Sequence, residues 1–216
     1  MAVKACLFDL DGTLLNTLFD IGDAMNHALS DNGLPEHSYD AYRYFVGNGV
    51  KVLTERATGF KEDAYDRVLA AYRAYYAAGC RNKTGPYEGI QAMLAALSRM
   101  GLPLCVLSNK PHDDTLEVVS YYFHDIAFAK VQGQLDSVPV KPDPAGALAI
   151  AKTLNISPSD FLYAGDTGVD MACARSAGMQ AVGVTWGFRP EAELLEYGAQ
   201  HIISHPDELP ALIQKG

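Results

Sequence analysis

Short runs of almost wholly apolar residues, each ending at a polar turn, constrain the fold of this chain more than any other feature. The clearest runs cover residues 3–9, 102–107 and 161–164, and shorter or weaker ones cover residues 126–131, 181–186 and 201–204. Strands that alternate apolar and polar residues belong to sheets with one face in water, whereas wholly apolar strands are typical of parallel sheets. The pattern therefore predicts a parallel sheet with helices on both faces.

Helical spacing of apolar residues fills most of the segments between these runs. Residues 88–100 carry apolar side chains at helical intervals and are followed by Gly101, a typical helix stop. The same spacing predicts helices over residues 143–154, 170–177 and 190–197. Strands that alternate with helices in this way predict an α/β fold with a Rossmann-like parallel sheet core.

Residues 17–79 break this alternation, because they contain no strand candidate. Their apolar spacing predicts amphipathic helices over residues 18–29, 39–45, 50–57 and 62–77. The polar stretch that follows contains glycine and proline and has the composition of a hinge. We therefore expect an inserted all-helical cap domain over residues 17–82, with residues 1–16 and 83–216 forming the α/β core.

Composition and charge limit the functions open to this chain. Its 216 residues include 17 Lys and Arg against 26 Asp and Glu, and the resulting charge of −9 disfavours binding to nucleic acid or to an anionic membrane. No apolar run approaches the roughly 20 residues that a membrane span needs. The four cysteines lack the spacing of a metal site, so we expect free thiols in a cytoplasmic protein.

Polar residues with the chemistry of a phosphate site follow the predicted strands. If the strands are parallel, their carboxyl ends share one edge of the sheet, where ligands bind in open α/β folds. The residues expected at this edge are Asp9, Asp11, Gly12 and Thr13 after the first strand, Ser108 and Asn109 after the second, Asp166 and Asp170 after a later one, and Lys141 before a helix.

Four carboxylates at one edge of a sheet need a cation. At a separation of 4 Å and an effective dielectric constant of 20, each like-charged pair costs about 4 kcal/mol, which Lys141 alone cannot offset. Oxygen ligands favour a hard divalent ion such as Mg²⁺, which binds through few carboxylates together with a substrate phosphate. The residues therefore predict a phosphate site built around Mg²⁺, with a small phosphorylated metabolite as its partner.

Each of these residues can take a distinct role in phosphoryl transfer. Asp9 is ionised at neutral pH and can attack phosphorus as a nucleophile. Asp11, two residues further on, can protonate the leaving oxygen and then accept a proton from water. Ser108 and Asn109 would hydrogen-bond the phosphoryl oxygens, and Lys141 would neutralise their charge and orient Asp9.

These motifs, in this order and at these strand ends, resemble those of the haloacid dehalogenase superfamily. The matching segments are Asp9-Leu-Asp-Gly-Thr-Leu, Ser108-Asn109-Lys110, Lys141-Pro and Gly165-Asp166-Thr-Gly-Val-Asp170. The resemblance implies Asp9 as nucleophile, Asp11 as general acid/base, and Mg²⁺ held by Asp9, the Asp11 backbone carbonyl and Asp166. It also implies that Asp170 binds the metal through water or holds Lys141, and that Gly12 and Thr13 contribute to substrate binding.

Within the superfamily, phosphoglycolate phosphatases are the most similar group, through residues 45–50, 86–90 and 185–188. This resemblance implies a phosphoric monoester hydrolase that works through an aspartyl-phosphate intermediate, most directly on 2-phosphoglycolate. Asn16 is a departure, since many relatives carry Asp there. A capped phosphomutase or pyrophosphatase stays open as an alternative, and a non-enzymatic phospho-acceptor signalling module is a remote one. Both a monomer and a homodimer stay open.

A few residues outside these motifs have both a structural and a functional interpretation. We expect His112 to start a helix and the tyrosines of the cap to pack between helices. Arg56 and Arg189 could clamp a carboxylate, but surface salt bridges are the favoured interpretation. The loop Gly47-Asn48-Gly49 is either a turn between helices or a backbone surface that faces the substrate.

Overall fold

A six-stranded parallel sheet forms the centre of the computed structural model, which describes residues 3–215. From one edge to the other, the sheet consists of β5 (Phe128–Gln134), β4 (Leu104–Pro111), β1 (Ala5–Phe8), β6 (Phe161–Gly165), β7 (Gln180–Val184) and β8 (His201–Ile203). β1 therefore lies in the middle, between β4 and β6. The order confirms the predicted parallel α/β core.

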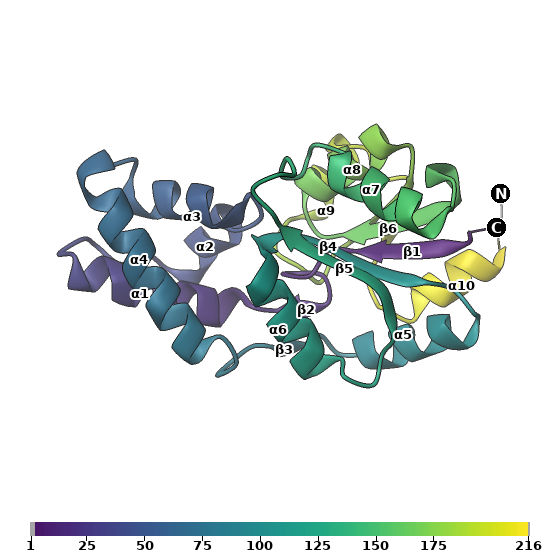
Figure 1. The fold of residues 1–216 in the computed structure, drawn as a ribbon, viewed down its shortest axis with the longest axis horizontal. Coiled ribbons are helices and arrows are strands. Elements are labelled where there is room, and N and C mark those ends of the chain that lie inside the picture. The colour runs from purple at the N-terminus through teal and green to yellow at the C-terminus, as the bar shows by residue number, and fades with distance from the viewer. Residues whose placement is uncertain (1–2, 216) are drawn as a thin grey trace.

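Successive residues of β1 point to opposite faces of the sheet, and each face has its own apolar cluster. Cys6 and Phe8 belong to one cluster, covered by α5 (Ile90–Arg99), α6 (His112–Tyr122) and α10 (Glu208–Lys215). Ala5 and Leu7 belong to the other, covered by α7 (Ala145–Leu154), α8 (Gly168–Ala177) and α9 (Glu191–Glu196). Figure 1 shows the two helical layers on either side of the sheet. Burial on both faces explains the wholly apolar strands.

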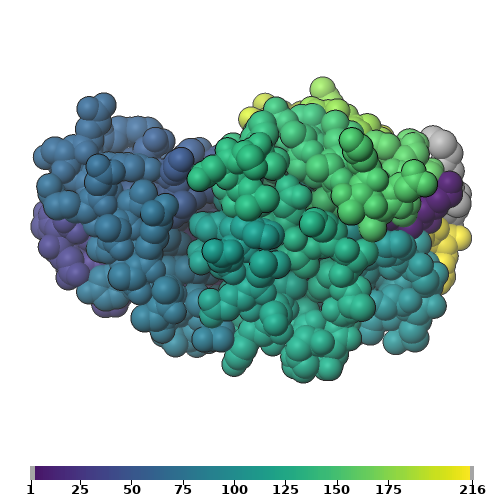
Figure 2. All heavy atoms as spheres, viewed as in Figure 1, coloured from purple at the N-terminus to yellow at the C-terminus, as the bar shows by residue number. Residues whose placement is uncertain are grey.

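A second group of helices lies beyond the carboxyl ends of the strands, at the left of Figure 1. It consists of α1 (Leu18–Asp31), α2 (Tyr39–Phe45), α3 (Gly49–Thr58) and α4 (Glu62–Gly79). Helices α1 and α4 pack along each other, and α2 and α3 pack against this pair. Figure 2 shows the group as a lobe that adjoins the larger α/β lobe. We call it the cap.

Two short strands connect the cap to the sheet. β2 (Leu15–Asn16) pairs antiparallel with β3 (Gly85–Pro86), so the chain enters and leaves the cap side by side. The buried carboxylate of Asp20, near the start of α1, accepts backbone hydrogen bonds from Lys83 at 2.9 Å and from Thr84 at 2.8 Å. These bonds tie the returning strand to the first cap helix.

The sequence located most elements but missed several short or terminal ones. β2 and β3 have two residues each, which is too short for any periodic pattern to reveal. Helix α10 and the short 3-10 helix η1 (Pro158–Asp160) were also not predicted. β4 extends past the apolar run, because it continues to pair with β5 as far as Pro111, which lies opposite Gln134.

The cysteines and the helices bear on two further expectations. All four cysteines are free thiols, as predicted, and the structure buries all of them. Burial raises the pKa of the Cys6 thiol to about 12, which keeps it protonated and unreactive. Among residues 3–215, no helix combines the length and the apolar character needed to cross a membrane.

Candidate active site

The carboxyl ends of β1 and β6 bring two of the predicted carboxylates together. β1 and β6 pair in register from Ala5 with Phe161 to Phe8 with Ala164, so Asp9 follows one strand beside Asp166, which follows the other. One carboxylate oxygen each from Asp9, Asp166 and Asp170 lies within 4.8 Å of the others, and all three residues are buried. Parallel pairing in the centre of the sheet is thus what builds the cluster.

The Asp166 side chain is fixed by two donors. Thr13 Oγ1 donates to Asp166 Oδ1 at 2.9 Å, and the backbone N–H of Phe188 donates to Oδ2 at 2.8 Å. Gly12 lies against the same carboxylate with φ +87°, and a Cβ at this position would overlap it. Only glycine combines that backbone conformation with this close approach. Gly12 and Thr13 therefore shape the site around Asp166.

Within residues 3–215, Lys141 carries the one positive charge that contacts this cluster. Its Nζ lies 2.8 Å from Asp9 Oδ1 and 2.7 Å from Asp170 Oδ1, and it also donates to the carbonyl of Leu107 at 3.1 Å. Asn109 brackets the Lys141 backbone, since its Oδ1 accepts from the Lys141 N–H at 2.8 Å and its Nδ2 donates to the carbonyl at 3.1 Å. Lys141 is therefore held at both its backbone and its ammonium.

Both oxygens of Asp170 are already engaged. Oδ1 accepts from Lys141 Nζ, and the Tyr163 hydroxyl lies 3.3 Å from it. Oδ2 accepts from the backbone N–H of Thr167 at 3.1 Å and from its hydroxyl at 2.7 Å. With Thr167, Asp170 forms a capping box at the N-terminus of α8, where negative charge is favoured. This arrangement favours the role of holding Lys141 over that of a metal ligand.

The buried negative charge changes the protonation of the site. Burial, followed by the charge of Asp170, raises the pKa of Asp9 well above its usual range, although Lys141 acts in the opposite direction. Burial and Asp170 also raise the pKa of Asp166 to about 7, against the hydrogen bonds from Phe188 and Thr13. Among the described residues, one ammonium, that of Lys141, contacts two of the three clustered carboxylates, and the excess negative charge is costly in the absence of a cation.

The donor set fits a hard divalent ion. Carboxylate oxygens are the ligands that Mg²⁺ prefers, and the cluster carries more negative charge than Lys141 balances. Asp9 and Asp166 are the better-placed ligands, because Asp166 accepts only from uncharged donors and Asp9 contacts Lys141 through Oδ1 alone, whereas Asp170 is held by both Lys141 and the capping box of α8.

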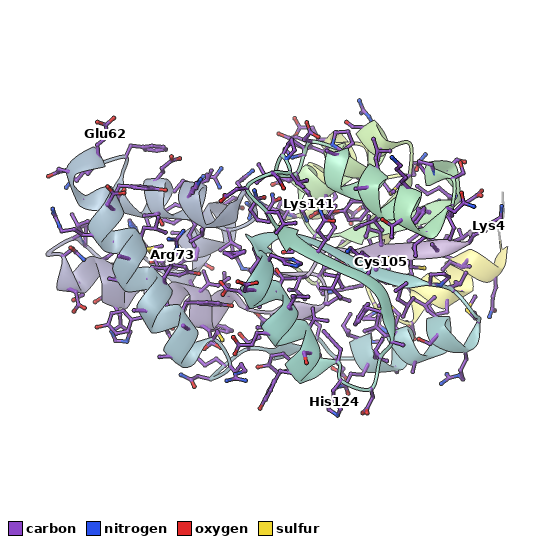
Figure 3. All side chains as sticks on the ribbon, in the orientation of Figure 1. Lys4, Glu62, Arg73, Cys105, His124 and Lys141 are labelled. Atoms are coloured by element: carbon purple, nitrogen blue, oxygen red, sulfur yellow. The ribbon has the colours of Figure 1, made fainter. Side chains whose placement is uncertain are left out.

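A cleft opens between the sheet and the cap. Figure 3 shows Lys141 at the end of the sheet that faces the cap. The cleft is lined by Asp9, Asp11, Ser108, Asn109, Lys110 and Pro111 from the α/β core and by Ile21, Val46, Gly47, Gly49, Val50, Leu53 and Tyr72 from the cap.

The loop at Gly47 faces this cleft. Asn109 Nδ2 donates to the Gly47 carbonyl at 3.0 Å, so one core side chain holds both Lys141 and the cap loop. Of the two interpretations left open by the sequence, the structure favours a backbone surface toward the cleft. Both polar atoms of the Asn109 side chain are engaged by these contacts.

Sequence reasoning missed the partner of Asp11. Lys110 Nζ lies 3.1 Å from each Asp11 carboxylate oxygen, and the side chains are 4% and 12% exposed. The pairing joins residues 99 positions apart and left no local signal. The one available hint was the position of Lys110 next to Ser108 and Asn109, which the sequence predicted to bind phosphate.

The expectation of surface salt bridges was right in part for Arg189, which pairs with Glu193 but from a buried position, and wrong for Arg56. Arg189 is buried: its Nη2 donates to the carbonyls of Val46 at 3.1 Å and Tyr44 at 3.3 Å, while its Nε lies 3.3 Å from Glu193. Half-buried Arg56 has no carboxylate partner in the described part of the chain and donates to the Tyr44 carbonyl at 2.8 Å. Both arginines therefore hold the end of α2, because its carbonyls lack helical partners there.

The remaining expectations concern single side chains. His112 is the first residue of α6, as predicted. Tyr42, Tyr72 and Tyr76 are buried, as the packing prediction requires, although Tyr72 also lines the cleft, whereas Tyr39, Tyr44 and Tyr75 are exposed. Asn16 lies in β2, and its buried Oδ1 has no hydrogen-bond partner within residues 3–215.

Comparisons with known proteins point to one family. The model described as haloacid dehalogenase-like hydrolase matches residues 6–184. A protein named phosphoglycolate phosphatase from Cereibacter sphaeroides (strain ATCC 17029 / ATH 2.4.9) is 35% identical over 217 residues, with 97% of each chain covered. One of the same name from Psychrobacter arcticus is 33% identical over 199 residues, covering 87% of this chain and 86% of that one. A haloacid dehalogenase-like family hydrolase from Streptococcus pneumoniae superposes with a TM-score of 0.90 at 27% identity, covering 98% of this chain and 99% of that one.

Proposed function

Because the chain belongs to the haloacid dehalogenase-like hydrolase family, we propose that it is a Mg²⁺-dependent phosphatase for a small phosphate monoester, most directly 2-phosphoglycolate. The observation that carries the proposal is the placement of Asp9. It lies at the floor of a cap-covered cleft, 2.8 Å from Lys141 and within one carboxylate cluster with Asp166. The names of the relatives support 2-phosphoglycolate as the substrate.

Asp9 is the nucleophile in this mechanism. Its carboxylate oxygen attacks phosphorus, the bond between phosphorus and the ester oxygen breaks, and an aspartyl-phosphate forms. Lys141 orients the Asp9 carboxylate and balances part of its charge, which favours the ionised form of Asp9 in a buried site. Asp170 acts through Lys141, because it holds the ammonium 2.7 Å away.

Asp11 moves the protons. It donates one to the leaving ester oxygen, which departs as an alcohol, here glycolate. Asp11 then accepts a proton from the water that attacks the aspartyl-phosphate, which releases phosphate and restores Asp9. Both carboxylates line the cleft, and Asp11 is held there by Lys110.

Other residues position the phosphoryl group. Ser108 lies in the second half of β4, lines the cleft and is suited to donate to a phosphoryl oxygen, together with backbone N–H groups of the turn at Gly12 and Thr13. Asn109, expected from the sequence to bind phosphoryl oxygens, is assigned here to holding Lys141 and the Gly47 carbonyl.

Asp9, Asp166 and the backbone carbonyl of Asp11 would hold Mg²⁺. Bound there, the ion would offset the negative charge of the carboxylates and of the phosphoryl oxygens. The proposed partners are this metal and a small phosphorylated metabolite, with no nucleic acid or membrane, in a cytoplasmic monomer or homodimer. The cap residues over the cleft would exclude water during transfer and limit substrate size.

Release of inorganic phosphate tests the proposal. Purified protein with Mg²⁺ is assayed against 2-phosphoglycolate, a panel of other small phosphate monoesters, and pyrophosphate, and kcat/KM values are compared. We expect the highest value for 2-phosphoglycolate and no activity in EDTA. Isomerisation of a sugar phosphate without phosphate release would indicate a mutase, and a preference for pyrophosphate would indicate a pyrophosphatase.

A further inference from the structure

Lys110 is a buried cation that the mechanism above uses only to hold Asp11. Its side chain is 4% exposed, and its Nζ lies 3.1 Å from both Asp11 oxygens. On the other side, Nζ lies 4.6 Å from the centroid of the Tyr76 ring, on cap helix α4. An ammonium carries three hydrogens, and a single carboxylate does not use them all.

The cleft gives this ammonium a second possible partner. Among the described residues that line the cleft, Lys110 is the one with a positive charge, and Asp9 and Asp11 are the ones with a negative charge. The remaining lining residues are apolar, small or neutral. An anionic group on the substrate, apart from its phosphate, would therefore find one cation in the cleft.

The distances restrict where that anionic group must be. Asp11 protonates the ester oxygen, so this oxygen lies within hydrogen-bond reach of Asp11 during transfer. Lys110 Nζ is 3.1 Å from the same carboxylate. In 2-phosphoglycolate the carboxylate carbon is two bonds from the ester oxygen. When the ester oxygen lies at Asp11, this carboxylate can therefore contact Lys110. A longer spacer would carry the charge past the ammonium.

The cap side of Lys110 offers a second indication of an unfilled polar contact. The Tyr76 hydroxyl is buried and has no hydrogen-bond partner within residues 3–215. Tyr76 stacks on Tyr72, itself a lining residue, with ring centroids 5.6 Å apart. Buried hydroxyls without partners are uncommon and costly, so the ring that contacts Lys110 carries an unpaired polar atom.

We propose that Lys110 is the specificity-determining residue that binds the substrate's carboxylate, and so selects short phosphate esters of hydroxy acids over neutral phosphate esters. This inference rests on the proposed phosphatase function and assigns recognition of the non-phosphate part of the substrate to the Lys110 ammonium. Lys110 then serves two partners, Asp11 and the substrate, at the same point of the cleft.

A pair of matched substrates tests the proposal in the unaltered protein. 2-Phosphoglycolate and 2-hydroxyethyl phosphate have the same chain length, but the second has a hydroxymethyl group in place of the carboxylate. With Mg²⁺ present, we expect kcat/KM to be about 10- to 100-fold higher for 2-phosphoglycolate, the range expected for one charged hydrogen bond. Equal values for the two esters would overturn the role of Lys110 and leave the phosphatase function standing.

Variants then connect the preference to this residue. Lys110→Met keeps most of the length of the side chain and removes the charge, so the ratio of the two kcat/KM values should fall toward one. Lys110→Arg should retain part of the preference. Lys51→Met is the matched control, because Lys51 is an exposed cation on α3 next to a lining residue, and its ratio should not change.

The ratio separates substrate binding from an effect on Asp11. A disturbed Asp11 would lower kcat/KM for both esters by the same factor, and an unchanged ratio in Lys110→Met would overturn the proposal. Lys110→Gln provides a second neutral variant if the Met variant does not fold. Failure of the unaltered protein to release phosphate from these two esters and from the wider panel would instead reject the phosphatase function itself, together with this inference.

Discussion

Lys141 Nζ lies 2.8 Å from Asp9 Oδ1, at a place where 3% of the lysine side chain and 8% of the aspartate side chain are exposed. The same ammonium lies 2.7 Å from the fully buried Asp170. Its charge is therefore shared by two carboxylates that have little contact with water. This relationship couples the stability of the carboxyl end of the sheet to the position of the proposed nucleophile.

Lys141→Met should reduce both stability and activity. It leaves two buried carboxylates without their counter-ion, which costs about 3–5 kcal/mol of unfolding free energy. Urea unfolding measures this loss, and phosphate release measures the accompanying loss of activity. Lys4→Met is the control, because the Lys4–Asp160 pair has a similar distance, 2.8 Å, but its lysine is 63% exposed. That variant should lose at most about 1 kcal/mol, and equal losses would contradict the assignment.

Asp9→Asn should abolish turnover while leaving the fold intact. The amide cannot attack phosphorus, so we expect phosphate release to fall by at least about 10³-fold and no phosphoenzyme to form. Rapid quench followed by mass measurement of the protein detects the aspartyl-phosphate directly. Asp125→Asn is the control, since that carboxylate is 89% exposed and remote in sequence from every motif. A phosphoenzyme in the Asp9→Asn variant would remove Asp9 from the role of nucleophile.

Mg²⁺ should stabilise the protein more at high pH than at low pH. The pKa of Asp166 is raised from 3.8 to about 7, so the folded state holds a proton that the unfolded state has lost over this interval. Stability of the metal-free protein therefore falls as pH rises from about 4 to 7, and the charged cluster then binds a cation more tightly. Thermal unfolding with Mg²⁺ and with EDTA, at about pH 5.5 and about pH 8, measures the difference. A larger Mg²⁺ shift at the lower pH would contradict this linkage.

Arg189→Ala should weaken the contact between the α/β core and the cap. Its guanidinium donates to the carbonyls of Tyr44 and Val46 and lies 5.0 Å from the Tyr44 ring. Since Val46 lines the cleft, we expect KM for the phosphate ester to rise, with kcat lowered as well, because closure organises the cleft. Arg99→Ala removes an exposed arginine of α5 and should leave both parameters unchanged. Unchanged steady-state kinetics in the Arg189 variant would argue against a role in closure.

Gly12→Ala should damage the site beyond the backbone strain that it introduces. Gly12 has φ +87° and Gly33 has φ +68°, so alanine is strained at both positions by about 1 kcal/mol. An alanine Cβ at position 12 also overlaps the Asp166 carboxylate, whereas at position 33 it meets nothing within 4 Å. Gly12→Ala should therefore lose activity and Mg²⁺-dependent stabilisation, and Gly33→Ala only a little stability. Equal effects on activity would show that the contact with Asp166 is unimportant.

Apart from α10 and the short elements β2, β3 and η1, the sequence predicted the strands and helices of the core with ends displaced by a few residues. This was possible because burial leaves a local pattern, as in β1, where every residue from Ala5 to Phe8 is buried. The residues of the cluster could also be predicted, since each follows a strand end. The hydrogen bond from the Phe188 backbone N–H to Asp166 could not be predicted, because a backbone donor depends on no particular residue type.

The sequence by itself determined the α/β core, the helical insertion and the carboxylates that cluster, because apolar periodicity and strand-end residues are local properties of the chain. The tertiary structure decided which charges meet. Lys110 reaches Asp11 across 99 residues and Arg189 reaches Tyr44 across 145, and no local pattern encodes either contact. Such contacts depend on how sheet and cap are placed against each other, since charged and polar groups buried at that junction must find partners from whichever elements packing brings near.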